Sequence, residues 1–168
     1  MEDMTSPKDD TGINRLERVR VQVDTVLYAV EDKAWQRKFF VHLYGVAECA
    51  ALLAKKRGLD AELAIVAGLL HDISAAKRGD YDNHCVLSAE MARNMLIEMG
   101  IFTVREMEQM YAAIFNHDFR DRTDAPFDEV LKDADILHPY LQSLVWPLNE
   151  PTKRRLESMM AELGMLQF

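Results

Sequence analysis

An apolar run from Leu63 to Leu70 ends directly in the doublet His71-Asp72. The run is typical of a buried helix. Burying a carboxylate beside an imidazole is unfavourable unless both groups are hydrogen-bonded or bind a metal ion. The fold therefore has to bring suitable partners to this point, and a metal site is the first hypothesis.

Length and charge limit the function classes. The chain has 168 residues, of which 49% are apolar, and a net charge of -8, as expected for one acidic folded domain. An acidic balance disfavours a nucleic-acid polymer or an anionic membrane as partner and favours a small molecule. Because no segment is apolar enough to span a membrane and the N-terminus does not resemble a secretory signal, we expect a cytoplasmic protein.

Hydrophobic periodicity predicts an all-α fold, because apolar residues recur at helical spacing and no stretch alternates like a strand. Gly58 and Gly100 are expected to end helices in the left-handed conformation, and Thr103 with Glu106 forms a capping box. The predicted helices cover residues 14–31, 35–57, 61–73, 84–99, 103–117, 127–146 and 151–163. We expect a flexible lead over 1–13, a single domain over 14–168, and loops at 74–83 and 118–125.

Helical phase identifies inward-facing ligand candidates. His42 shares a face with apolar residues at steps of three and four, and His71 lies in line with Leu63 and Ala67. Imidazoles that converge between helices are a common way for bundles to build metal sites. Asp133 and Asp135 both fall at the edge of one apolar stripe, so phase does not choose between them.

Several other residues have a simpler interpretation. His138 is read as a core histidine. Both cysteines, Cys49 and Cys85, lack metal-ligand spacing and are read as reduced, partly buried thiols. His84 can be an exposed residue at a helix start, and His117 can interact with a helix dipole without any metal.

An ordered set of motifs resembles the HD-domain metal-dependent phosphohydrolase superfamily. The order is His, His-Asp, His, His, Asp over about residues 38–145. The matching segments are His42-Leu43-Tyr44-Gly45-Val46-Ala47, Ala67-Gly68-Leu69-Leu70-His71-Asp72-Ile73, His84-Cys85-Val86-Leu87-Ser88-Ala89-Glu90, Ala112-Ala113-Ile114-Phe115-Asn116-His117 and Leu131-Lys132-Asp133-Ala134-Asp135-Ile136-Leu137. The resemblance implies a single HD-domain bundle of about six or seven helices.

The resemblance also implies a ligand set. One metal ion would be held by His42, His71, Asp72 and Asp135, and in two-metal members Asp72 would bridge to a second ion held by His84 and His117. The Ala-Asp-x-Leu context favours Asp135, with Asp133 facing solvent. The ions would be divalent transition metals, namely Mn, Fe, Co, Ni or Zn, one or two per chain.

The implied activity is hydrolysis of a phosphate ester, a nucleotide or a small phosphomonoester, by a metal-activated hydroxide. Asp72 would be the central catalytic ligand, and Lys77 and Arg120 would bind phosphate oxygens, with Arg78 and Arg122 as further candidates. Many family members follow the doublet with Ile-Gly-Lys or Ile-Gly-Arg, whereas this chain has Ile73-Ser74-Ala75-Ala76-Lys77, so the usual cation has moved. An HD-fold di-iron oxygenase and a non-catalytic, metal-stabilised binding domain are the alternatives, and oligomerisation is left open.

Overall fold

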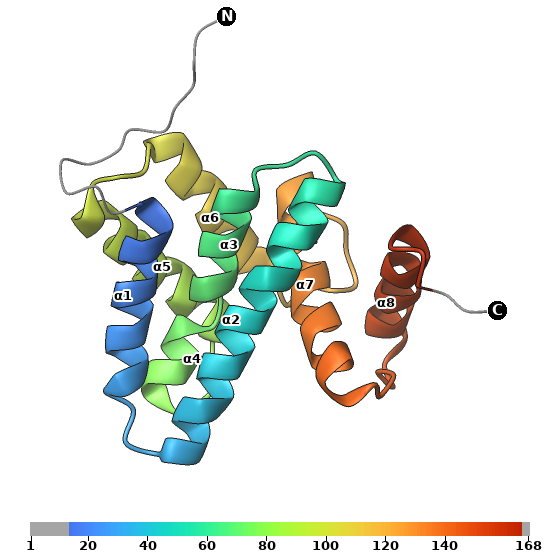
Figure 1. Ribbon diagram of the computed structural model, residues 1–168, viewed down its shortest axis with the longest axis horizontal. Coiled ribbons are helices and arrows are strands. Elements are labelled where there is room, and N and C mark those ends of the chain that lie inside the picture. The colour runs from blue at the N-terminus through green and yellow to red at the C-terminus, as the bar shows by residue number, and fades with distance from the viewer. Residues whose placement is uncertain (1–13, 166–168) are drawn as a thin grey trace, which may run out of the picture.

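The computed structural model describes residues 14–165, which form eight α-helices and no strand (Figure 1). Their bounds are α1 Arg15–Tyr28, α2 Lys33–Lys56, α3 Ala61–Leu70, α4 Ile73–Arg78, α5 His84–Met99, α6 Val104–Asn116, α7 Pro126–Ser143 and α8 Glu150–Glu162. The predicted all-α bundle is confirmed. The lead predicted over 1–13 lies outside the described residues. Among those described, no helix is both long and apolar enough to cross a membrane.

Local sequence signals explain most helix ends. The Asp60 side chain accepts from the Leu63 N–H at the start of α3, and Thr103 and Glu106 form the expected capping box on α6. Gly58 and Gly100 have positive φ angles of 69° and 64°, which a residue without a side chain adopts at little cost. The predicted glycine ends and the predicted capping box are therefore confirmed.

Two helix boundaries differ from the prediction. The helix expected over 61–73 ends at Leu70, and α4 occupies the first half of the expected 74–83 loop. Six residues are too few to show a helical period, although Ile73 and Ala76 are fully buried. The helix expected over 127–146 ends at Ser143, and Val145, within the expected range, is exposed.

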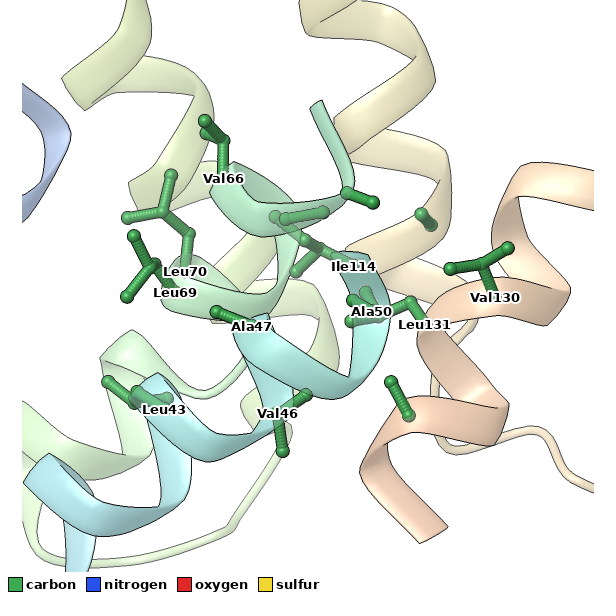
Figure 2. Close-up of a cluster of buried hydrophobic side chains, with 14 of the residues drawn as sticks. Leu43, Val46, Ala47, Ala50, Val66, Leu69, Leu70, Ile114, Val130 and Leu131 are labelled. Carbon is green, nitrogen blue, oxygen red and sulfur yellow. The ribbon is translucent and has the colours of Figure 1, made fainter. Parts of the chain in front are cut away.

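The core lies where α2, α3 and α7 pack against one another and α6 packs against α3 and α7. Figure 2 shows Leu43 and Ala47 of α2 beside Leu70 of α3, with Ile114 of α6 and Leu131 of α7 completing the cluster. All five are at most 3% exposed. Residues that carry the candidate ligands are thus anchored on packed helices, which restricts their movement.

Gly68 marks the closest approach of α2 and α3. A methyl group built at Gly68 would lie 2.6 Å from the Ala47 Cα and 2.8 Å from the Ala47 nitrogen, both backbone atoms. Ala67 is also buried, as expected for small residues between closely packed helices. The glycine is therefore required by helix packing.

We expect Gly68→Ala to lower the free energy of unfolding by about 1 to 3 kcal/mol, because the helices must separate to admit the methyl group. This is the net loss, after a gain of about 1 kcal/mol in helix propensity from glycine to alanine. Gly45→Ala is the matched comparison, since the three atoms nearest to its methyl group all belong to the His138 side chain and not to a helix backbone. Urea unfolding measures both, and equal or greater stability of Gly68→Ala than of the wild type would contradict this packing.

Candidate metal centre

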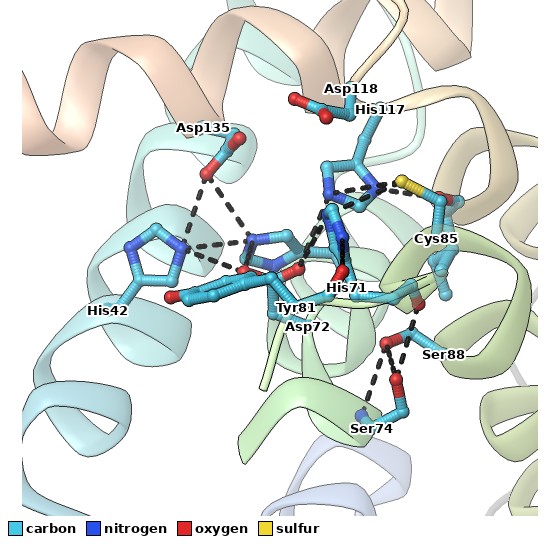
Figure 3. Close-up of polar contacts among 12 residues, drawn as sticks. His42, His71, Asp72, Ser74, Tyr81, Cys85, Ser88, His117, Asp118 and Asp135 are labelled. Carbon is cyan, nitrogen blue, oxygen red and sulfur yellow. Dashed lines mark hydrogen bonds and ion pairs between the residues drawn. The ribbon is translucent and has the colours of Figure 1, made fainter. Parts of the chain in front are cut away.

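Five segments bring their ligand-type side chains to one place (Figure 3). His42 comes from the middle of α2, and the doublet His71-Asp72 forms the junction between α3 and α4. His84 begins α5, His117 follows the end of α6, and Asp135 lies within α7. All six candidate ligands predicted from the sequence therefore converge.

The first group of candidate ligands consists of His42, His71 and one oxygen from each of Asp72 and Asp135. His42 Nε2 lies 3.1 Å from His71 Nε2. Asp135 Oδ1 lies 3.3 Å from the Nε2 of His42 and 3.4 Å from that of His71, and Asp72 Oδ2 lies 3.5 and 3.6 Å from the same two atoms. Four ligands at about 2.1 Å around a tetrahedral ion would be about 3.4 Å apart. The spacing of the His42, His71 and Asp135 atoms fits one metal ion, and the Asp72 oxygen lies at a similar distance from both imidazoles.

The second group surrounds the other oxygen of Asp72. Asp72 Oδ1 lies 3.6 Å from His84 Nε2 and 3.4 Å from His117 Nε2. This buried oxygen has no hydrogen-bond partner among the described residues, which is costly unless a cation satisfies it. One carboxylate thus presents each of its oxygens to a different pair of imidazoles.

Backbone carbonyls orient three of the four imidazoles. Each histidine uses Nδ1 to contact the carbonyl three residues earlier: His71 with Gly68 at 2.8 Å, His84 with Tyr81 at 2.8 Å, and His117 with Ile114 at 2.6 Å. Because a carbonyl can only accept, Nδ1 carries a proton, and Nε2 is the ring nitrogen left to face the centre. This is the usual arrangement of metal-ligating histidines. The donor set therefore fits divalent transition metals.

The electrostatics of the metal-free cluster favour bound protons on its imidazoles. Burial alone would lower the pKa of His42, but the Asp135 and Asp72 carboxylates outweigh burial and raise it to about 9. The contact with the Cys85 side chain raises the pKa of His84 to about 9 as well. Burial opposes this shift, and the charge of Asp72 adds to it. Although burial would raise the pKa values of both aspartates, the nearby imidazoles hold them well below their usual range. Protons and metal ions therefore compete for this cluster.

The pH dependence of metal-free stability follows from these shifts. Imidazoles with raised pKa values contribute stability that is fully present below about pH 6.5 and is lost as the pH rises through about 9. The aspartates contribute above about pH 4, and this contribution is lost as the pH falls through their lowered pKa values. We therefore expect the melting temperature of the metal-free protein to fall between pH 6.5 and 9.

Metal loading should reverse this trend, because the neutral imidazoles bind the ion and their deprotonation removes the competing protons. Thermal melts with chelator and with added metal, each at pH 6.5 and 9, measure the difference. A metal-free melting temperature that does not fall over this interval would contradict the described proton binding.

A cavity of about 670 Å³ opens beside the cluster. Arg120 lines it and contacts Asp135 Oδ2 through a nitrogen 2.6 Å away, while its Nε has no hydrogen-bond partner among the described residues. The end of α7 and the segment leading to α8 also line the cavity, including Tyr140, Trp146 and Leu148. Tyr140 and Trp146 pack with ring centroids 5.3 Å apart. The cavity thus joins the polar cluster to an apolar surface.

The other predicted phosphate-binding cations do not line this cavity. Lys77 is exposed near the end of α4. Arg78 pairs with Asp80, and Arg122 pairs with Asp124. Lys77 lies outside the lining of the cavity, because α4 buries Ile73 and Ala76 and leaves Lys77 exposed, and its role in binding phosphate stays a prediction.

Asp133 and Asp135 occupy opposite environments on α7. Asp135 joins the histidine cluster, whereas Asp133 pairs with Arg57 at 2.7 Å and with Arg155 at 3.1 Å. The expectation that Asp133 faces solvent is wrong, since it is only 7% exposed. Its separation from the cluster nonetheless agrees with the choice of Asp135.

His138 is buried, as expected for a core histidine, but its Nε2 has no hydrogen-bond partner among the described residues. Its ring centroid is 5.8 Å from that of His42. Burial, reinforced by the charge of His42, lowers the pKa of His138. A neutral ring is therefore favoured here.

Sequence reasoning missed three contributors. Cys85 lies 3.4 Å from His84 Nε2, and its position directly after a candidate ligand was the available signal. Ser74 Oγ lies 2.9 Å from Ser88 Oγ and donates to the His84 carbonyl at 3.3 Å, so it ties α4 to the start of α5. Tyr81 lines the cavity and packs edge-on against His84.

Comparison with known proteins identifies the class. The HD domain family matches residues 39–140, and the chain belongs to this family. A solved structure described as a predicted HD superfamily hydrolase, from an uncultured Thermotogales bacterium, is similar with a TM-score of 0.57 and 25% identity over 88% of this chain and 86% of that one. The resemblance inferred from the motifs is confirmed.

A curated relative shares part of the chain. Ribonuclease Y of Mycoplasma mycoides is 35% identical over 94 residues, which make up 50% of this chain and 22% of that protein. The present chain therefore spans less than a quarter of the length of this relative.

Proposed function

We propose that the protein is a metal-dependent phosphohydrolase that cleaves a small phosphate ester. The observation that carries this proposal is Asp72, whose two oxygens face two separate pairs of histidines. His42, His71 and Asp135 would complete the first ion site, and His84 and His117 belong to the second. Two ions held by these residues would supply activation of a water molecule and polarisation of a phosphoryl oxygen.

Arg120 is the residue that we propose to position the phosphate. It lines the cavity beside the first group, and its pairing with Asp135 fixes the guanidinium next to a proposed ligand. The Arg120 carbonyl also accepts from Arg155 Nε at 2.7 Å, which holds the backbone of this loop. A fixed guanidinium is suited to binding phosphate oxygens.

The cavity supports a nucleotide or a similar phosphomonoester as the substrate. Its volume of about 670 Å³ lies within the range of small-molecule sites, about 300 to 1,000 Å³. Tyr140 and Trp146 offer aromatic surface in the same cavity as the ligand cluster, and aromatic rings stack on nucleobases. The net charge of -8 disfavours long polyanions.

The relative named Ribonuclease Y makes RNA the second candidate substrate. An RNA phosphodiester presents the same phosphoryl group to the metal centre. Because the chain is acidic, RNA binding would depend on basic side chains that contact the phosphates. The affinity for RNA would then fall steeply as the salt concentration rises.

A panel of phosphoesters tests the proposal. The protein is loaded in turn with Mn, Fe, Co, Ni and Zn and incubated with nucleotides, small phosphomonoesters and a short single-stranded RNA, and released phosphate or cleaved RNA is measured. We expect phosphate from at least one monoester. RNA cleavage alone would favour the second candidate, whereas oxygen consumption with ferrous iron and no hydrolysis would favour a di-iron oxygenase. Metal binding without either reaction would favour a binding domain.

A further inference from the structure

The thiol of Cys85 lies against the second group of ligands. Its Sγ is 3.4 Å from His84 Nε2 and 4.0 Å from His117 Nε2. Figure 3 shows the sulfur beside the His117 ring and directed toward the cluster. The ligand atoms of His84, Cys85 and His117 all lie within 4.8 Å of one another.

These separations suit a shared metal ion. A thiolate at about 2.3 Å and an imidazole nitrogen at about 2.05 Å around a tetrahedral ion would be about 3.6 Å apart. The two sulfur–nitrogen distances lie on either side of this value. The thiol can therefore reach an ion held by both imidazoles with small side-chain movements.

A second observation comes from Asp72. Its Oδ1 is buried, lacks a hydrogen-bond partner among the described residues, and faces the same two imidazoles at 3.6 and 3.4 Å. Oxygens and nitrogens at about 2.1 Å from a tetrahedral ion would be about 3.4 Å apart. Asp72 thus offers an oxygen to the same two imidazoles that the Cys85 thiol approaches.

We propose that Cys85 is a thiolate ligand of the second ion and makes this position selective for zinc or another thiophilic ion. This inference rests on the metal centre of the proposed function. Binding forms a sulfur–metal bond and releases the thiol proton to solvent, with no change in oxidation state. The first position has only nitrogen and oxygen ligands and therefore accepts harder ions such as manganese or iron.

The two positions thus differ in metal preference within one chain. Imidazole and carboxylate ligands leave the first position open to several divalent ions, whereas the added sulfur at the second favours zinc and cobalt over manganese. A centre with two different ions becomes the expected state when both zinc and manganese are supplied.

Cobalt spectroscopy tests the assignment, because a cobalt–thiolate bond gives a near-ultraviolet charge-transfer band that nitrogen and oxygen ligands do not. The full chain has two cysteines, so Cys49→Ala leaves Cys85 as the single source of such a band. Cys49 is buried in the hydrophobic core away from the cluster. We expect the band in the wild type and in Cys49→Ala, and its loss in Cys85→Ser.

Metal titration of the same proteins gives the energetic readout. We expect Cys85→Ser to weaken cobalt binding at the second position on the order of tenfold or more, with the first position unchanged. Two cobalt ions bound to Cys49→Ala without a charge-transfer band would overturn the role of Cys85 and leave the proposed function intact. Failure of the wild type to bind any cobalt would overturn both.

Discussion

Replacing Asp72 by alanine should reduce phosphoester hydrolysis by about three orders of magnitude or more, since both ion positions lose a ligand at once. Its Oδ2 faces His42 and His71, and its Oδ1 faces His84 and His117. The carboxylate does not cap α4, at whose N-terminus it lies. Its removal should therefore alter the metal centre far more than the helical fold.

Circular dichroism, metal content and phosphate release of Asp72→Ala measure these effects together. The matched control is Asp121→Ala, which removes an exposed aspartate from the loop between α6 and α7. The control should keep both metal and activity. Near wild-type hydrolysis by Asp72→Ala would contradict the bridging role.

Alanine at Asp135 and at Asp133 should give opposite results. Asp135→Ala removes the carboxylate that contacts His42 and His71, so metal affinity at the first position should fall on the order of a hundredfold or more. Activity should fall with it. Asp133→Ala should retain the metal centre, because Asp133 contacts Arg57 and Arg155 instead.

The stability of these two variants should also differ. Asp133→Ala removes a buried carboxylate that pairs with two arginines. Such a removal ordinarily lowers the free energy of unfolding by several kcal/mol. Arg57 and Arg155 keep their pairs with Glu162 and Glu129, and burial raises the pKa of Asp133 despite both arginines. We therefore expect a smaller loss of about 1 to 3 kcal/mol by urea unfolding. Lost metal binding in Asp133→Ala with retained binding in Asp135→Ala would reverse the assignment.

The surroundings of Asp133 and Asp135 explain why helical phase does not show which of the two is the ligand. A stripe pattern assumes that one face of a helix meets solvent. On α7, however, α2 and α6 pack on one part of the helix and α8 on another, so nearly every residue from Phe127 to His138 is buried. The family context of Asp135 pointed to the site, whereas the burial of Asp133 depends on arginines from α2 and α8.

Other differences have similar physical causes. The long helices and their caps follow from local signals, but α4 is stabilised by burial of Ile73, Ala75 and Ala76 against the rest of the bundle. Its presence leaves Lys77 in solvent. The contact between Cys85 and His117 joins α5 to the end of α6, and a separation of 32 residues leaves no periodic trace. Tertiary packing determines each of these features.

Oxygen labelling tests the central claim most directly. The metal-loaded protein is incubated with the phosphoester it hydrolyses best, in water enriched in ¹⁸O, and the released phosphate is analysed by mass spectrometry. Attack of water on phosphorus predicts one labelled oxygen in each phosphate and none in the alcohol product. Label in the alcohol instead, or no phosphate from any ester while ferrous protein consumes dioxygen, would contradict metal-dependent phosphohydrolysis.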